Sequence, residues 1–379
     1  MSDTGDGPGK IGAVAETSEA RLRLSVIVPA RNEAEVLGEC LESLVGQSEA
    51  GFALGEEWEL IVVDDGSTDG TRGIAQAVAS TREGVVVIDA PALDLSERGG
   101  FTGKTNACWA GAQRAWSHGG GAWLLFTDAD TVHEPGDLAR ALHEAKKYGV
   151  ALLSYSPRQI VTGFWQRAVM PLVFSELASV YPPKQVSDPA SRLAAANGQF
   201  MLAEREAYFA VGGHRGVGLE ILEDVALARK IKRAKHGIRF RYAPDALAAR
   251  MYRTLPEMVE GWTKNLALLF PRPLWLAGGR MLYLLLFFGL PVLALTLPSS
   301  RLAWQLAWQP AVIWLLWLLW LRTLWRFYGR VARSNFPAAD AAVSILGVPM
   351  FCCLLVRSHL HHRVQKLVGW KGRSYKVGR

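Results

Sequence analysis

Short apolar runs alternate with amphipathic stretches between Arg23 and about Tyr155, and this alternation limits the possible folds more than any other feature of the chain. The apolar runs and then the stretches between them are Leu24–Pro29, Leu60–Asp64, Val85–Asp89 and Trp123–Thr127, with Glu33–Leu44, Thr71–Ala79 and Thr105–Ser117. Strands that are apolar on both faces and separated by helices are typical of a mostly parallel sheet covered by helices on both sides. The sequence therefore predicts an α/β, Rossmann-like domain that binds its ligand at the carboxyl ends of the strands.

Acidic residues follow two of these runs directly, at the strand ends where a ligand would bind. Asp64 and Asp65 lie in "LIVVDDGSTDGT", which an ordinary turn would also explain, and Asp128 and Asp130 lie in "WLLFTDADT". Alternate side chains of an extended segment share a face, so the second pair can converge on one cation. Carboxylates gathered at one sheet edge repel one another unless a cation is present, and their oxygens suit Mg²⁺ or Mn²⁺ together with diphosphate oxygens.

A third acidic pair, Glu223 and Asp224, opens a predicted helix in "GLEILEDVALARKIKRAKHG". Acids at this position also cap a helix and interact favourably with its N-terminal dipole. This segment alone therefore fits a structural role as well as a chemical one.

Five stretches, taken in order, resemble the family 2 glycosyltransferases, whose domain has a nucleotide-sugar-binding fold. They are "SVIVPARNEAEVLGECLESL", "VVDDGSTDGT", "FTDADT", "NGQFMLAEREAYFAVGGHRG" and "EDVALARKIKRAKHG". The resemblance covers roughly residues 22 to 250. It implies transfer of a sugar from a nucleotide-sugar, with Mn²⁺ or Mg²⁺ as the cofactor.

The same resemblance implies roles for individual residues. Asp64 or Asp65 would contact the base and ribose of the donor, and the two are not separable from sequence. Asp130, with Asp128 helping, would hold the metal on the diphosphate. Asp224, beside Glu223, would be the catalytic base. The other implied substrate contacts are Pro29, Ala30, Glu33, Lys104, Asn106, Gly198 and Trp262.

Two segments depart from known patterns. The stretch "RGGFTGKTNA" suggests a phosphate-binding P-loop, but Arg98 stands where that pattern needs Gly. Lys104 fits a solvated loop lysine as well as a donor contact. The stretch "MVEGW" keeps the Trp of the QxxRW motif of processive synthases, as Trp262, but lacks its Gln and Arg, which disfavours a processive enzyme. Trp262 also fits an anchor at a membrane interface.

The C-terminal third of the chain is apolar, and the excess of positive charge lies at its end. Half of the 379 residues are hydrophobic, the net charge is +7, and eleven Lys or Arg but one acid lie from Arg322 onward. A basic tail of this kind indicates contact with a membrane surface, or a contribution to solubility, and not a nucleic-acid-binding surface spread over the fold. Three stretches approach the ~20 residues that span a bilayer. They are Pro273–Leu297, Leu302–Leu321 and Ala338–Val356.

We therefore expect a flexible leader over residues 1–21, a catalytic domain over 22–262, a membrane region over 263–356 and a basic tail over 357–379. Within the catalytic domain, Gly163–Pro183 fits a buried helix or a membrane-surface helix equally well.

The expected activity is inverting transfer of one sugar from a UDP- or GDP-sugar to a lipid hydroxyl or carboxyl, at the cytosolic face of the cell membrane. The arrangement of "GKTNA", "TDAD", "ILED" and the terminal "GWKGRSY" most resembles the single-sugar lipid branch of the family, such as the hopanoid-associated, carotenoid or ceramide glycosyltransferases. A polysaccharide synthase of the same family and an inactive nucleotide-sugar-binding membrane protein are the alternatives.

The charge pattern also predicts a multi-pass topology. Positive segments stay in the cytosol, and both Arg322–Arg333 and the tail are basic. We predict that the first two apolar stretches cross as a hairpin, and that the third, interrupted by Gly347 and Pro349, is re-entrant or shallow. A cysteine introduced by Arg379→Cys should then resist an impermeant thiol reagent in intact cells, whereas labelling there would support three crossings.

Overall fold

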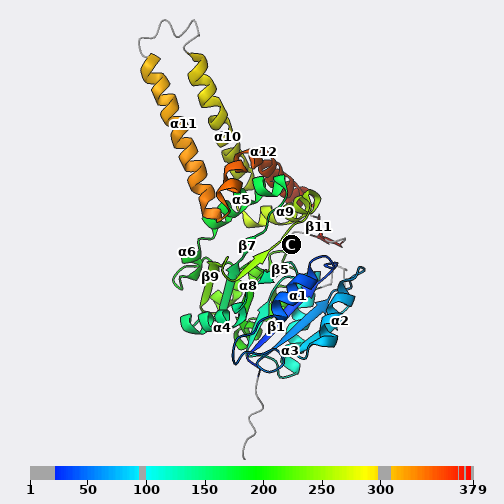
Figure 1. Ribbon diagram of the computed structural model, residues 1–379. Helices are drawn as coiled ribbons and strands as arrows, with labels where there is room; N and C mark the ends of the chain where they lie inside the picture. The colour runs from blue at the N-terminus through cyan, green and yellow to red at the C-terminus, as the bar shows by residue number, and fades with distance from the viewer. Residues whose placement is uncertain (1–21, 94–99, 298–308, 366, 371–372, 377–379) are drawn as a thin grey trace, which may run out of the picture.

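The computed structural model describes residues 22–93, 100–297, 309–365, 367–370 and 373–376 (Figure 1). The predicted leader, the loop after the first apolar stretch and the start of the second stretch lie outside these residues. Within the described part of the chain, an α/β domain adjoins a helical region, and two long helices project from that region.

A central sheet forms the α/β domain, with its described strands in the order β3-β2-β1-β4-β8-β6-β9. Their bounds are β1 Leu24–Ala30, β2 Trp58–Asp64, β3 Val85–Asp89, β4 Trp123–Phe126, β6 Leu152–Ser156, β8 Met201–Glu204 and β9 Ile238–Tyr242. The strand β8 runs antiparallel to β4 and β6, while the other neighbouring pairs are parallel. The mostly parallel sheet predicted from the sequence is therefore confirmed, and its four predicted strands are β1 to β4.

Helices cover both faces of this sheet, because alternate residues of a strand point to opposite sides. Val26 and Val28 of β1 pack in the core cluster that holds α1 and α4, and Ile27 packs in the cluster that holds α3 and α8. The helices are α1 Leu37–Val45, α2 Thr71–Thr81, α3 Gly103–Ser117, α4 Asp137–Tyr148 and α8 Glu223–Arg233. The first helix begins later than predicted because the Glu33 N–H donates to Thr71 Oγ1 at 2.8 Å, which holds Glu33 in the loop.

A small sheet braces the segment that follows β4. Its strands, in order, are β5 Thr131–His133, β10 Leu247–Ala249 and β7 Arg158–Gln159. Just past β10, the Arg250 N–H donates to the carbonyl oxygen of Asp130 at 3.0 Å. The acidic segment after β4 is therefore held from two sides.

The helical region has a core cluster of its own, formed by α5, α9, α10, α11 and α12. Their bounds are α5 Phe164–Val180, α9 Leu255–Leu269, α10 Pro273–Thr296, α11 Gln309–Val331 and α12 Ala338–Leu360. Figure 1 shows α10 and α11 projecting side by side, while α12 lies with α5 and α9 against the α/β domain. Val169, Met170 and Val173 of α5 are buried in this cluster, so α5 is a buried helix.

Ion pairs tie α10, α11 and α12 to α5, and the pair between Arg280 and Glu176 is buried. Arg280 of α10 donates from Nε to Glu176 Oε1 of α5 at 2.7 Å, and Arg330 of α11 lies 3.7 Å from the other oxygen of Glu176. Arg167 of α5 pairs with Asp340 of α12 at 2.5 Å. The helical hairpin therefore has a defined attachment to the rest of the molecule.

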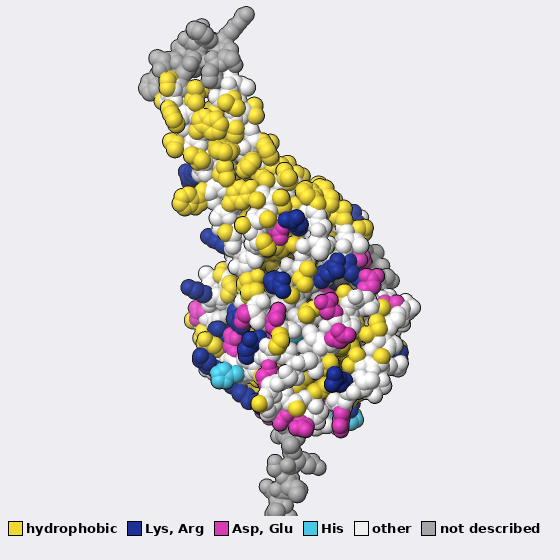
Figure 2. Space-filling view, in the orientation of Figure 1, with side chains coloured by type: hydrophobic (Ala, Val, Ile, Leu, Met, Phe, Trp, Pro, Cys, Tyr) yellow, Lys and Arg dark blue, Asp and Glu magenta, His cyan; other side chains and the backbone are white. Residues whose placement is uncertain are grey.

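Two helices among the described residues are long and apolar enough to cross a bilayer, namely Pro273–Thr296 and Ala338–Gln365. In their most apolar windows, 11% of the first is buried within the protein but 50% of the second. Hydrophobic side chains dominate the visible surface of the projecting helices, whereas charged side chains gather over the α/β domain (Figure 2). The apolar surface of α10 therefore suits contact with lipid, while α12 packs largely against protein.

The expected interruption at Gly347 and Pro349 is wrong, because α12 continues through both as one helix. Gly347 instead permits a close helix crossing: a Cβ at this position would overlap the carbonyl oxygen of Ala168 in α5.

This crossing makes a prediction about stability. Gly347→Ala should lower the free energy of unfolding by about 1–3 kcal/mol, because backbone atoms must move to admit the methyl group. The matched control is Gly279→Ala in α10, where a Cβ meets nothing within 4 Å. The control should be neutral or stabilising by up to ~1 kcal/mol. Thermal unfolding in detergent compares the two, and equal stabilities would contradict the close crossing.

Candidate active site

A cavity of about 420 Å³ opens at the carboxyl ends of β1, β2 and β4. Acidic side chains dominate its polar lining: Glu33, Asp65, Asp128, Asp130, Glu223, Asp224, Glu257 and Glu260. Its cationic lining residues are Arg31, Lys104, Arg250, Arg253, Lys264 and Arg373. Three of the four strand-end acids predicted from the sequence, Asp65, Asp128 and Asp130, therefore meet in one place, together with the acids of α8.

Lys104 bridges two groups of acids in this cavity. Its Nζ lies 2.7 Å from Asp128 Oδ1 and 3.1 Å from Glu223 Oε1. A capping box between Thr102 and Thr105 fixes the start of α3 and thus the direction of the lysine. Burial alone would lower the pKa of Lys104, but the two carboxylates outweigh it and raise the pKa well above its usual value. Lys104 therefore stays charged, and it is not a solvated loop lysine.

Backbone N–H groups hold the carboxylate of Asp224 at the N-terminus of α8. Its Oδ2 accepts the Gly198 N–H at 3.0 Å, and its Oδ1 accepts the Val225 N–H at 2.7 Å. The N-cap of α8, Leu222, has no side-chain cap, and Asp224 instead accepts the Val225 N–H, one of the free donors of the first helical turn. Burial, and then the charge of Glu223, raise the pKa of Asp224 to about 7. A carboxylate with this pKa can accept a proton near neutral pH.

Gly198 keeps these charged groups close together. A Cβ at this position would lie 2.8 Å from Lys104 Nζ and 3.4 Å from Glu223 Oε1. Any side chain would push the ammonium group away from its two carboxylates. The missing side chain at Gly198 thus leaves room for the ammonium group of Lys104 in its observed position.

The two acids that sequence could not separate have different surroundings. Asp65 lines the cavity, whereas Asp64 accepts the Ser67 N–H at 3.3 Å and lies 3.8 Å from Arg72. Asp64 therefore serves the turn after β2. The carbonyl of Asp65 accepts a hydrogen bond from Arg31 Nη1 at 2.5 Å, and its carboxylate pairs with Arg373.

The structure places most of the other predicted contacts in the cavity, but not all of them. Pro29, Ala30, Glu33 and Gly198 line it. Asn106 is buried behind the lining and donates from Nδ2 to the carbonyl of Pro91 at 2.7 Å. Trp262 lies in the helical core, where its indole N–H contacts Sδ of Met170 at 3.4 Å. This placement gives a substrate contact by Trp262 no support.

The sequence analysis did not predict several of the residues that line the cavity. On α9, Glu257, Glu260 and Lys264 follow one another at spacings of three and four, which places them on one helix face. That spacing could have been noticed, but nothing in it indicated which surface the face would meet. Arg250 and Arg253 carried no local signal. Arg373 lies in "GWKGRSY", a stretch that indicated a branch of the family but not a place in the cavity.

The chemistry of the lining suits a divalent cation in part. Asp128 and Asp130 both line the cavity, and Mg²⁺ or Mn²⁺ is commonly held by one or two carboxylates plus phosphate oxygens. Among the described residues, no group of three or more His, Cys, Asp or Glu side chains is arranged to hold a metal. A metal here would therefore need oxygens from a ligand, and it would share Asp128 with Lys104.

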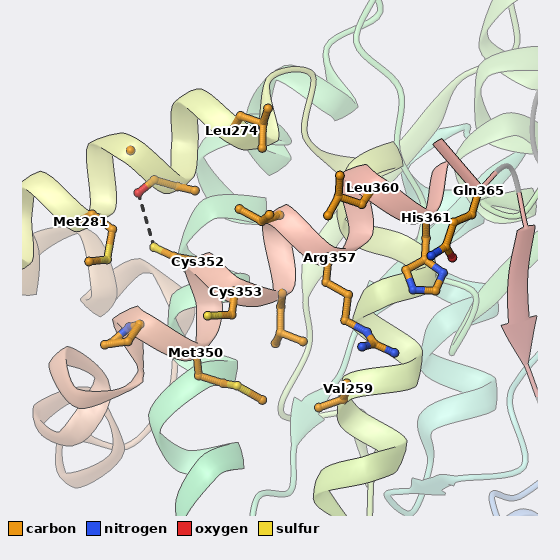
Figure 3. Close-up of a pocket in the computed structure, with 15 residues that line it drawn as sticks. Val259, Leu274, Met281, Met350, Cys352, Cys353, Arg357, Leu360, His361 and Gln365 are labelled. Carbon is orange, nitrogen blue, oxygen red and sulfur yellow. Dashed lines mark hydrogen bonds between the residues drawn. The ribbon is translucent and has the colours of Figure 1, made fainter. Parts of the chain in front are cut away.

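A second, apolar cavity of about 910 Å³ lies between α9, α10 and α12. Figure 3 shows Leu274 and Met281 on α10, and Cys352 on α12 directed toward α10, among the residues that line it. Its polar lining residues are Arg357, His361 and Gln365, at the C-terminal end of α12 and beyond it. The cavity thus offers an apolar space beside α10.

Residues 25–208 match the family described as "Glycosyl transferase family 2". The chain therefore carries a family 2 glycosyltransferase domain, as its sequence motifs predicted. The matched segment contains the three strands that border the cavity and Asp65, Asp128 and Asp130.

Known proteins agree with this assignment. The 4,4'-diaponeurosporenoate glycosyltransferase of Staphylococcus aureus (strain MRSA252) is 29% identical over 249 residues, which are 64% of this chain and 60% of the relative. A mannosyltransferase from Pyrobaculum calidifontis, solved in complex with GDP-Man and Mn²⁺, has a TM-score of 0.51 at 18% identity, covering 91% of this chain and 88% of that one. The second likeness shows a shared fold.

The pKa of Asp224 makes a prediction for a glycosyltransferase that uses it as a base. Protonated below its pKa and ionised above it, Asp224 should make kcat/KM for transfer rise with pH and level off above about pH 7. Asp224→Asn should remove this rise. A wild-type profile that is flat between pH 5.5 and about 8.5 would contradict a base with this pKa.

Proposed function

We propose that the protein is a membrane-bound, inverting glycosyltransferase that transfers one sugar from a UDP- or GDP-sugar to a lipid acceptor. The observation that carries the proposal is the position of Asp224. It lies in the same cavity as Asp65, Asp128 and Asp130, so one site offers a base beside groups suited to a nucleoside diphosphate. A base has no purpose in a protein that only binds the nucleotide-sugar.

The nucleotide end of the donor would lie at the ends of β1 and β2. Pro29, Ala30 and Glu33 line that part of the cavity, and Asp65 would accept hydrogen bonds from the base or ribose. The diphosphate would then lie toward Asp128 and Asp130. Lys104 is placed to stabilise its negative charge. Asp130 and Asp128 would hold a divalent cation, which acts as a Lewis acid on the leaving diphosphate when bound.

Transfer to a hydroxyl follows as one displacement. Asp224 removes the proton from the acceptor hydroxyl while its oxygen forms a bond to the anomeric carbon. The bond from that carbon to the diphosphate breaks, and the nucleoside diphosphate leaves with the electron pair. Attack on the face opposite the leaving group inverts the anomeric carbon, and the chain needs no covalent nucleophile. A carboxylate acceptor is already ionised at neutral pH, so it would not need the base.

Three features support a lipid acceptor. The apolar cavity lies beside α9, and the opposite side of α9 lines the candidate active site. Trp275, Leu282 and Leu285 of α10 are 81%, 55% and 64% exposed, as suits a helix in lipid. The Staphylococcus relative is named for a diaponeurosporenoate, an apolar chain with a carboxylate. In this proposal an apolar chain lies in the 910 Å³ cavity, and its reactive end passes around α9 to reach Asp224.

Removal of divalent metal tests the donor side of the proposal. EDTA should abolish transfer and Mn²⁺ or Mg²⁺ should restore it, because a leaving diphosphate needs its charge neutralised. Asp130→Ala should lose metal-dependent nucleotide binding as well as turnover. Full activity of the chelated wild-type enzyme would contradict this role.

Profiling of nucleotide-sugars tests the function as a whole. Purified protein is incubated with each UDP- or GDP-sugar, with and without extracted membrane lipid, and release of the nucleoside diphosphate is followed. Release should depend on lipid, and the sugar should appear in the lipid fraction. With a hydroxyl acceptor, Asp224→Asn should slow transfer by about 10²–10⁴-fold. With a carboxylate acceptor the loss should be small. Equal transfer to soluble sugars without lipid would refute the lipid acceptor.

A further inference from the structure

A C-terminal hairpin reaches the candidate donor site from the far end of the chain. Its strands are β11 Leu367–Trp370 and β12 Arg373–Lys376, which pair antiparallel with Trp370 opposite Arg373. Figure 1 shows β11 beside α9, at the level where the helical region meets the α/β domain. Arg373, the first residue of β12, lines the acidic cavity.

The guanidinium group of Arg373 contacts Asp65 with both of its terminal nitrogens. Nη1 pairs with Oδ2 of Asp65, and Nη2 lies 3.3 Å from Oδ1, across 308 residues of sequence. The two side chains are only 14% and 8% exposed. A two-pronged contact of this kind fixes the plane of a carboxylate as well as its position.

Arg373 borders the cavity without filling it. With the side chain in place, the cavity still has about 420 Å³, within the ~300–1,000 Å³ range of small-molecule sites. Its lining holds eight acids and six cations, so loss of Arg373 would leave an even more negative space for an anionic diphosphate. If the role of Arg373 were to block the donor, its side chain would occupy the cavity itself.

We propose that Arg373 is a positioning residue of the donor site, which orients the carboxylate of Asp65 toward the nucleoside of the donor. This inference rests on the proposed function. It adds a residue that lies outside the segment matching the glycosyltransferase family. It also requires the hairpin to lie on the same side of a membrane as the catalytic domain.

The test measures the dissociation constants of UDP and GDP, and the KM of the donor that turns over, on the full-length protein in detergent. Arg373→Gln should weaken nucleotide binding and raise the donor KM by about 10- to 100-fold, the effect of losing a hydrogen-bonded charge. The acceptor KM and kcat should change little. Arg373→Lys keeps the charge but not the two-pronged contact, so it should restore binding only in part.

Two controls separate this role from a general effect of the tail. Arg363→Gln removes an exposed positive charge that precedes the hairpin and should leave nucleotide binding unchanged. Asp65→Asn combined with Arg373→Gln should bind no more weakly than Asp65→Asn alone, because Arg373 acts through Asp65. Unfolding temperatures check that each variant is folded.

The outcomes distinguish the inference from the function on which it rests. If wild type and both Arg373 variants bind the nucleotide equally, the inference is overturned while the proposed function stands. Tighter binding or faster turnover in Arg373→Gln would also overturn it, since Arg373 would then be inhibitory. If the wild-type protein binds neither UDP nor GDP, the proposed function itself fails.

Discussion

The ammonium group of Lys104 allows the acids of the cavity to approach one another. Asp128 follows a strand of the sheet and Glu223 opens a helix on its face, and both would be repelled from the same space without a cation between them. The lysine in turn depends on the cap that starts α3 and on the missing side chain of Gly198. Asp224, next to Glu223, acquires its raised pKa in this same setting. The proposed chemistry therefore depends on one cluster in which the charge of Lys104 offsets the charges of Asp128 and Glu223.

The sheet brings that cluster together from distant parts of the sequence. Because β1, β2 and β4 are parallel neighbours, their carboxyl ends open on a common edge. Residues 250–253, which follow the small sheet, and α9 then line the other side of the cavity, and α9 also borders the apolar cavity. In the proposed function, this one helix separates the polar space suited to a donor from the apolar space suited to a lipid.

The sequence was most informative where local pattern decides structure. Buried strands of continuous apolar residues, two of them followed by acids, predicted both the parallel sheet and the edge at which Asp65 and Asp128 meet. It was least informative about contacts made across the chain. Nothing in the sequence around Arg373 indicated that it would reach Asp65. Trp262 matched one residue of a known motif, but its side chain packs in the helical core. Gly347 suggested a break in a helix, whereas its actual role is a close crossing that only the position of α5 explains.

The anomeric configuration of the transferred sugar tests the central claim most directly, because it reports how the bond at the anomeric carbon was exchanged. With the donor that turns over, the coupling constant of the anomeric proton in the purified product identifies the configuration by NMR. Direct displacement in this cavity, with an acceptor activated by Asp224, predicts a product of inverted configuration. Retention of the donor's configuration would contradict the account, since it would require a covalent intermediate or a reaction on the same face of the sugar.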